Sequence, residues 1–140
     1  MSRLAAAFLF CAGLVHVILG VSAITGAARL EANVQEIETS AVGGNLYLAL
    51  GGMGLIMTLV AVLEFTAAGF LYTRGARARV LGLVAGYLAM GVVFWTLPIF
   101  RWASVATLVL LFSSAYLLTY RVTEAFASTE GRRIPPDVPM

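Results

Sequence analysis

The sequence predicts an all-α membrane protein, folded as an antiparallel bundle of four transmembrane helices with both termini in the cytoplasm. Its 140 residues are 61% hydrophobic and only 11% charged, whereas soluble domains are about 25% charged. The mean hydropathy is +0.94. A spanning helix needs roughly 20 apolar residues, so 140 residues accommodate about four spans. This leaves no room for a soluble catalytic domain.

Four apolar runs form the predicted spans, at residues 4–24, 46–72, 80–97 and 102–120. The first has some features of a signal peptide, because Arg3 precedes an apolar region. We interpret it as the first span. The second would form a helix of about 40 Å, longer than the roughly 30 Å hydrocarbon core, which predicts a tilt. Short connections predict that the last three spans are antiparallel neighbours.

The remaining segments are predicted to lie at the membrane surfaces. Within residues 30–39, Leu30, Val34 and Ile37 recur at helical spacing among glutamates, which predicts an acidic amphipathic helix on the outer surface. Pro98 ends the third span near that surface. Residues 1–121 form the transmembrane domain. Residues 122–140 are predicted to be a cytoplasmic tail, either extended or docked on a partner.

The distribution of arginine predicts the orientation. The more basic side of a membrane protein faces the cytoplasm. One side holds Arg3, Arg74, Arg77, Arg79, Arg121, Arg132 and Arg133, and the other holds Arg29 and Arg101. We therefore expect a multi-pass protein of the bacterial inner membrane, with the lipid bilayer as its surroundings.

Small residues indicate where the helices pack, because lipid tails provide no hydrophobic drive between helices. Gly82 and Gly86 form a Gly-x-x-x-Gly pattern in the third span. Gly13 and Gly20 lie on one side of the first span, which also carries His16. These positions predict close helix contacts, within one molecule or between two.

Glu64 is the one charged residue within 46–72. A carboxylate in hydrocarbon is costly unless it is paired, protonated or hydrated, so Glu64 is a candidate functional residue. Its distance from Arg74 places it about 15 Å from the cytoplasmic end, and His16 lies about 20 Å from Arg3. His16 is therefore its predicted partner.

Three further polar residues, Tyr87, Ser113 and Ser114, lie about 11–12 Å from the nearest cytoplasmic arginine. Together with Glu64 and His16 they predict a polar cavity in the inner half of the membrane. A simpler interpretation stays open. Glu64 would then only hydrogen-bond across helices, reach toward the basic residues or contact a partner, and His16 would be a hydrogen-bonded core residue.

Other chemistries lack the residues that they need. Cys11 is the single cysteine, and His16 the single histidine, so no zinc cluster is predicted and haem between two histidines would need a symmetric dimer. No glycine-rich phosphate loop follows a strand. The arginine clusters serve topology, so no nucleic acid partner is expected. We expect no metal and no cofactor.

Two stretches carry a resemblance to a family. They are Phe10-Cys11-Ala12-Gly13-Leu14-Val15-His16-Val17-Ile18-Leu19-Gly20, and Ala78-Arg79-Val80-Leu81-Gly82-Leu83 followed by Leu97-Pro98 and Trp102-Ala103-Ser104. The sequence resembles a family of four-helix integral membrane proteins of high-GC bacteria. That family has no assigned activity, so the resemblance implies the fold. Glu64 is not a hallmark of the family.

The sequence favours a non-enzymatic accessory or assembly subunit of a larger membrane complex, of transporter or respiratory type. The expected partner is another membrane protein or further copies of the chain. Two alternatives stay open. One is a small proton-coupled transporter that uses Glu64, and the other is a membrane-embedded enzyme that uses Glu64 and His16 on a lipid-soluble substrate.

Overall fold

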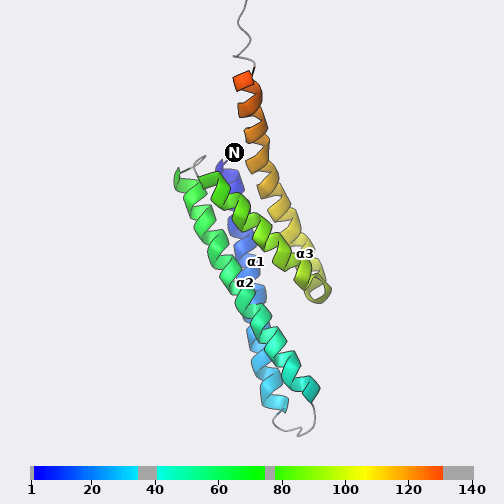
Figure 1. The fold of residues 1–140 in the computed structure, drawn as a ribbon. Helices are drawn as coiled ribbons and strands as arrows, with labels where there is room; N and C mark the ends of the chain where they lie inside the picture. The colour runs from blue at the N-terminus through cyan, green and yellow to red at the C-terminus, as the bar shows by residue number, and fades with distance from the viewer. Residues whose placement is uncertain (1, 35–40, 75–77, 131–140) are drawn as a thin grey trace, which may run out of the picture.

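The computed structural model describes residues 2–34, 41–74 and 78–130, and within these the side chains of residues 3–29, 48–74 and 78–120. The described chain forms three helices (Figure 1): α1 Ser2–Val34, α2 Ala41–Arg74 and α3 Arg79–Glu130. Each contains a stretch long and apolar enough to cross a membrane, at Arg3–Arg29, Leu48–Arg74 and Arg79–Tyr120. The prediction of an all-helical protein with helices long and apolar enough to cross a membrane is confirmed for the described residues. The described chain has three such helices, whereas the sequence predicted four.

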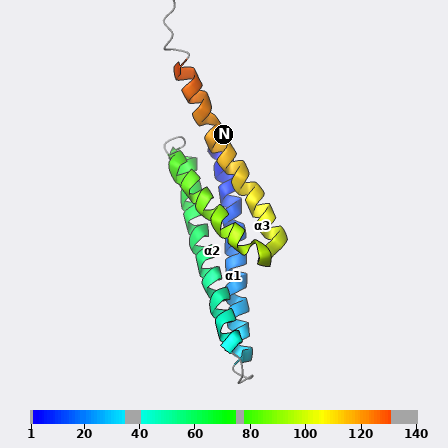
Figure 2. The same ribbon diagram turned by 45° about the vertical axis from the view of Figure 1, so that its right-hand side comes forward.

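Helix α3 consists of two helical parts joined across a kink. Its backbone leaves the helical region at Phe100 (φ −107°, ψ 22°) and Arg101 (φ 3°, ψ −82°). Pro98 lies inside the helix just before the kink, and its missing N–H weakens the helix there. Both views show that the second part turns back toward the end where α3 begins (Figures 1 and 2). The kink stands where the sequence predicted a loop between residues 97 and 102.

The helices also extend further than predicted. Residues 30–34 continue α1 instead of starting a separate surface helix, and residues 35–40 lie outside the described chain. Residues 122–130 continue α3, whereas the sequence predicted an extended or docked tail. No proline interrupts either continuation, and both contain alanine and glutamate, which are good helix formers. The rest of that tail, residues 131–140, is not described.

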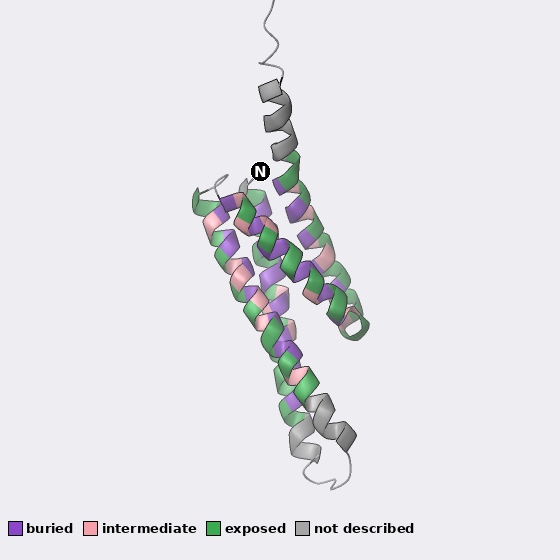
Figure 3. Cartoon of the chain, in the orientation of Figure 1, coloured by how far each residue is buried: buried purple, intermediate pink, exposed green. Residues whose placement is uncertain are grey.

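The three helices meet around the first half of α1. α1 and α2 run antiparallel, and the folded α3 lies against the end that holds the start of α1 and the end of α2 (Figures 1 and 2). Both parts of α3 contact α1, since Gly86 faces Leu9 and Ser114 donates a hydrogen bond to the Ala5 carbonyl. Figure 3 shows that buried and exposed positions alternate along each helix. The core contains Ala5, Leu9, Ala12, Ala67, Leu71, Ala85, Ala89, Val93, Leu111 and Leu118.

Hydroxyl groups on the outer faces of the helices are satisfied within their own helices. Each donates to the carbonyl one turn earlier: Thr25 to Val21, Thr66 to Val62, Thr73 to Gly69, Ser113 to Val109 and Thr119 to Ala115. Thr58, whose hydroxyl faces Gly20 of α1, donates to the Gly54 carbonyl in the same way. A hydrocarbon environment offers no water to these groups. The pattern is therefore compatible with helices surrounded by lipid.

The closest approach of two helices lies between Gly20 of α1 and Gly54 of α2. A Cβ atom on Gly54 would stand 2.6 Å from the Gly20 carbonyl oxygen, and one on Gly20 would stand 2.9 Å from the Gly54 carbonyl oxygen. Both neighbours are backbone atoms, which cannot rotate away. Glycine at these two positions therefore sets the separation of α1 and α2.

Three other glycines, Gly13, Gly82 and Gly86, face side chains. A Cβ atom on Gly13 would lie 2.9 Å from the Phe65 ring, and one on Gly82 would lie 2.7 Å from Leu71. At Gly86 the nearest atom, on Leu9, would be at an ordinary contact distance of 3.9 Å. Gly86 is therefore buried, but a Cβ atom would fit at this position.

The glycine contact can be tested with two alanine substitutions on α2. We expect Gly54→Ala to lower the free energy of unfolding by about 1–3 kcal/mol, because the added methyl group forces two backbones apart. Gly52→Ala is the matched control, since a Cβ atom there meets nothing within 4 Å, and it should be neutral or stabilising by up to about 1 kcal/mol. Equilibrium unfolding in mixed detergent micelles measures both. Equal effects of the two substitutions would contradict the proposed role of Gly54.

Candidate functional site

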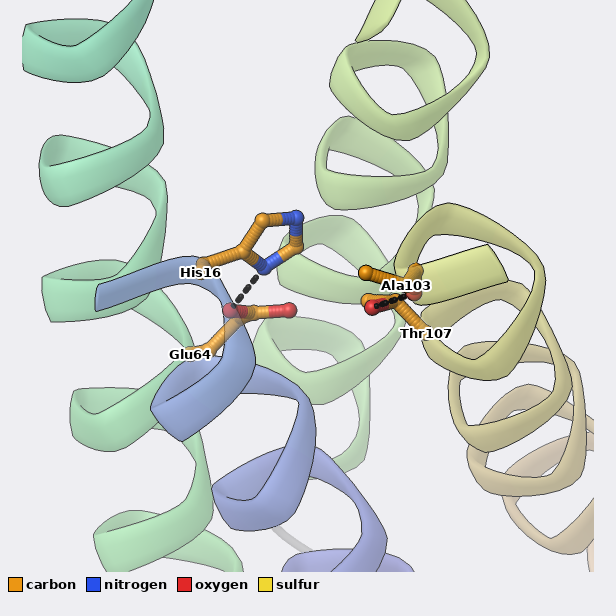
Figure 4. A network of polar contacts seen from close by, with 4 residues as sticks. All are labelled: His16, Glu64, Ala103 and Thr107. Atoms are coloured by element: carbon orange, nitrogen blue, oxygen red, sulfur yellow. Dashed lines mark hydrogen bonds and ion pairs between the residues drawn. The ribbon is translucent and has the colours of Figure 1, made fainter. Parts of the chain in front are cut away.

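His16 of α1 and Glu64 of α2 meet in the seam between the two helices. Their Nδ1 and Oε2 atoms lie 2.8 Å apart, and both side chains are fully buried (Figure 4). The contacts of Gly13 with Phe65 and of Gly20 with Gly54 lie on either side of this pair along α1. The close approach of the helices therefore holds the two side chains within hydrogen-bond distance and encloses them.

The pair can be buried as a neutral unit. With two exchangeable protons shared between the two groups, either a carboxyl O–H donates to Nδ1, or a protonated imidazole donates to a carboxylate. Both forms have zero net charge, and either is cheaper to bury in hydrocarbon than an isolated carboxylate. Gain or loss of one proton would leave a net charge in the seam, which is costly to bury.

Helix α3 covers the pair with a polar face. Figure 4 shows the Glu64 carboxylate extending toward the turn of α3 that holds Ala103 and Thr107. The Thr107 hydroxyl is buried and donates a 2.7 Å hydrogen bond to the Ala103 carbonyl. Ser104 and Thr96, on either side of the kink, are buried as well. Buried hydroxyl groups thus accompany the pair at the level where α3 turns.

Three buried polar atoms around this level have no hydrogen-bond partner among the described residues: His16 Nε2, Glu64 Oε1 and Ser104 Oγ. Such atoms are uncommon in proteins and often mark sites that bind water, ions or substrates. Each residue of the pair therefore keeps one free hydrogen-bonding position beside the bond that joins them.

The other predicted polar residues do not join this cluster. Tyr87 is 59% exposed on the outside of α3. Ser113 donates to the Val109 carbonyl of its own helix at 2.7 Å. Ser114 is buried, but it bonds to the Ala5 carbonyl at 3.2 Å and so ties α3 to α1. The structure therefore unites His16 and Glu64 and separates the predicted binding residues from them.

Sequence reasoning missed Thr96, Ser104 and Thr107. A signal for the last two was present, because the buried positions of the second part of α3 recur at spacings of three and four. These positions are Ser104, Thr107, Leu111, Ser114 and Leu118. Extending this spacing backward from Leu118 would have placed the hydroxyl groups of Ser104 and Thr107 on the inward face of the helix.

The site differs from a metal centre and from an open pocket. No group of three or more His, Cys, Asp or Glu side chains comes together within the described part of the chain. The pockets found on the described surface are lined by other residues than His16 and Glu64. Comparison of the chain with protein-family models, curated proteins and solved structures gave no match. The site must therefore be judged from its own geometry.

A double-mutant cycle measures how strongly the pair stabilises the fold. We expect His16→Leu and Glu64→Leu each to lower the free energy of unfolding by about 1–3 kcal/mol, because each leaves the other group buried without its partner. The double variant should lose less than the sum of the two, because it leaves neither polar group behind. Ser113→Ala serves as the control and should be nearly neutral. Strictly additive losses in micelle unfolding experiments would show that the two groups are not coupled.

Proposed function

We propose that the chain crosses the bacterial inner membrane four times, with two of the crossings made by α3. The apolar part of α3, Arg79–Tyr120, has 42 residues. A continuous helix of that length would measure about 63 Å, twice the hydrocarbon thickness of roughly 30 Å. The kink at Phe100 and Arg101 divides it into two parts of suitable length.

The kink carries the features of a membrane interface. Trp95 and Trp102, which flank it, are 56% and 86% exposed, and Arg101 is exposed. Tryptophan and arginine are enriched at the boundary between lipid and water. At the opposite end, Arg3 stacks over Tyr72 at 5.4 Å. Because the more basic side of a membrane protein faces the cytoplasm, we infer that both termini lie inside and that the kink lies outside.

The topology can be tested by labelling single cysteines with a membrane-impermeant maleimide. In a Cys11→Ala background, we expect Trp102→Cys to react in intact spheroplasts and Arg74→Cys to react only after permeabilisation. Both positions are exposed on the protein surface. Whether each cysteine reacts therefore depends on whether lipid covers it and on which side of the membrane it lies. If α3 crossed once, residue 102 would lie near the membrane centre and would resist labelling on both sides.

We further propose that the protein is a non-enzymatic accessory or assembly subunit of a larger membrane complex, of transporter or respiratory type. The observation that carries this proposal is the enclosure of the one His–Glu pair, in which both side chains are 0% exposed. A transporter or an enzyme must bring its substrate to the reactive group, whereas a structural pair needs only to join helices. The two alternatives, which use Glu64 with or without His16, would require an opening to this seam.

The place of a partner is suggested by the two-helix arm, in which α1 and α2 extend past the turn of α3 (Figures 1 and 2). The arm carries a shallow hollow of about 430 Å³, lined by Ile24, Ala27, Ala28, Leu48, Gly51, Gly52 and Leu55. This hollow lies on the part of α1 and α2 that α3 does not cover. Exposed apolar hollows of this kind fit a partner helix, from another protein or another copy.

Purification in a mild detergent tests the accessory role. We expect other membrane proteins to co-purify with the wild-type chain in a fixed ratio, as quantitative mass spectrometry would measure. Gly52→Leu should remove them, because it fills the hollow where a side chain meets nothing within 4 Å. Gly91→Leu, at an equally open glycine of α3, is the control. A stable homo-oligomer that lacks any other protein would overturn the accessory role.

A further inference from the structure

A groove between α1 and α2 lies at the end opposite the two-helix arm. It has a volume of about 470 Å³, within the range of about 300–1,000 Å³ that is typical of ligand sites. Its lining is largely apolar, and Arg3 and Tyr72 stand at one end of it. None of its lining residues belongs to the His16–Glu64 site or to the hollow on the arm.

The shape of the groove suits a hydrocarbon chain. Small residues form much of its lining, including Ala6, Ala68 and Gly69. The rings of Phe10 and Phe65 also line it, with their centroids 5.1 Å apart. From Arg3 to Phe10 the groove follows two turns of α1, about 10 Å along the helix axis. An unbranched acyl chain can lie in such a groove.

The charge at its end suits an anionic headgroup. Arg3 is exposed, and its guanidinium lies over the Tyr72 ring at 5.4 Å from the centroid. Among the residues that the structure describes, Arg3 forms no ion pair with a carboxylate; the one such pair joins His16 and Glu64. A guanidinium presents five N–H donors in a planar arrangement that matches phosphate oxygens.

We propose that this groove binds one anionic phospholipid, with the phosphate at Arg3 and the start of one acyl chain on the surface formed by Ala6, Ala68 and Gly69. Arg3 and the apolar groove together favour a ligand that has both an anionic headgroup and a hydrocarbon chain. A free phosphate ion would leave the groove unfilled. The proposal is independent of the accessory role and of the His16–Glu64 pair.

Lipid titration of the detergent-solubilised full chain, followed by native mass spectrometry, tests the charge selectivity. The probes are phosphatidylglycerol and phosphatidylcholine with identical acyl chains. We expect the first bound phosphatidylglycerol to bind at least about fivefold more tightly, the size expected for one arginine that faces anionic lipid. Arg3→Gln should remove this preference. Arg29→Gln, an exposed arginine at the other end of α1, should retain it. Equal binding of the two lipids, or an unchanged preference in Arg3→Gln, would overturn the proposal.

The location is tested with Gly69→Leu, because a side chain at Gly69 meets nothing within 4 Å and would occupy the groove. We expect weaker phosphatidylglycerol binding in this variant and unchanged binding in Gly91→Leu. Cys11, the single cysteine, is exposed and lines the groove. Phosphatidylglycerol should therefore slow its alkylation in the wild type, and inorganic phosphate should not. Protection by phosphate alone would indicate an ion site, and unchanged alkylation with phosphatidylglycerol would place the lipid elsewhere; either result contradicts the proposal.

Discussion

The hydrogen bond between His16 and Glu64 is the constraint on which the arrangement of α1 and α2 depends. Neither group can be buried alone in hydrocarbon without a large cost, so the two helices must place them opposite each other. A distance of 2.8 Å between Nδ1 and Oε2 fixes both the register and the facing sides of the helices. The backbone contact of Gly20 with Gly54 permits this approach. The His16–Glu64 pair therefore determines which faces of α1 and α2 meet, and Gly20 and Gly54 allow these faces to pack closely.

The sequence predicted helices apolar enough to cross a membrane, and one of the interpretations that it left open paired His16 with Glu64. An uninterrupted apolar run around Glu64 identifies a buried carboxylate. Its depth of about 15 Å, counted from Arg74, lies within one helical turn of the depth of about 20 Å counted for the single histidine. The same count of depth along the helices grouped Tyr87 and Ser113 with the pair, and the structure separates them from it. Equal depth does not imply the same face, since successive helical residues point about 100° apart. Tyr87 accordingly faces outward, whereas Thr107, which was not predicted, faces the pair.

The helix boundaries were harder to predict because hydropathy describes composition and not the backbone path. Pro98 was expected to end a helix, yet it lies inside α3, and the backbone departs from helical geometry only at Phe100 and Arg101. Residues 30–34 and 122–130 are polar enough to suggest surface segments. They nevertheless continue α1 and α3, because good helix formers extend a helix that already exists at little cost.

Helix α3 decides whether the pair can take part in chemistry. On the side of α1 and α2 the seam is closed by the Phe65 ring against Gly13 and by the contact of Gly20 with Gly54. The second contact involves backbone atoms and cannot open by rotation of a side chain. On the side of α3 buried hydroxyl groups accompany the pair. One of them, Ser104 Oγ, has no hydrogen-bond partner among the described residues, and the same holds for Glu64 Oε1. Access to the pair would therefore require α3 to move at its kink. An accessory role requires no such movement, and the closed seam is sufficient for it.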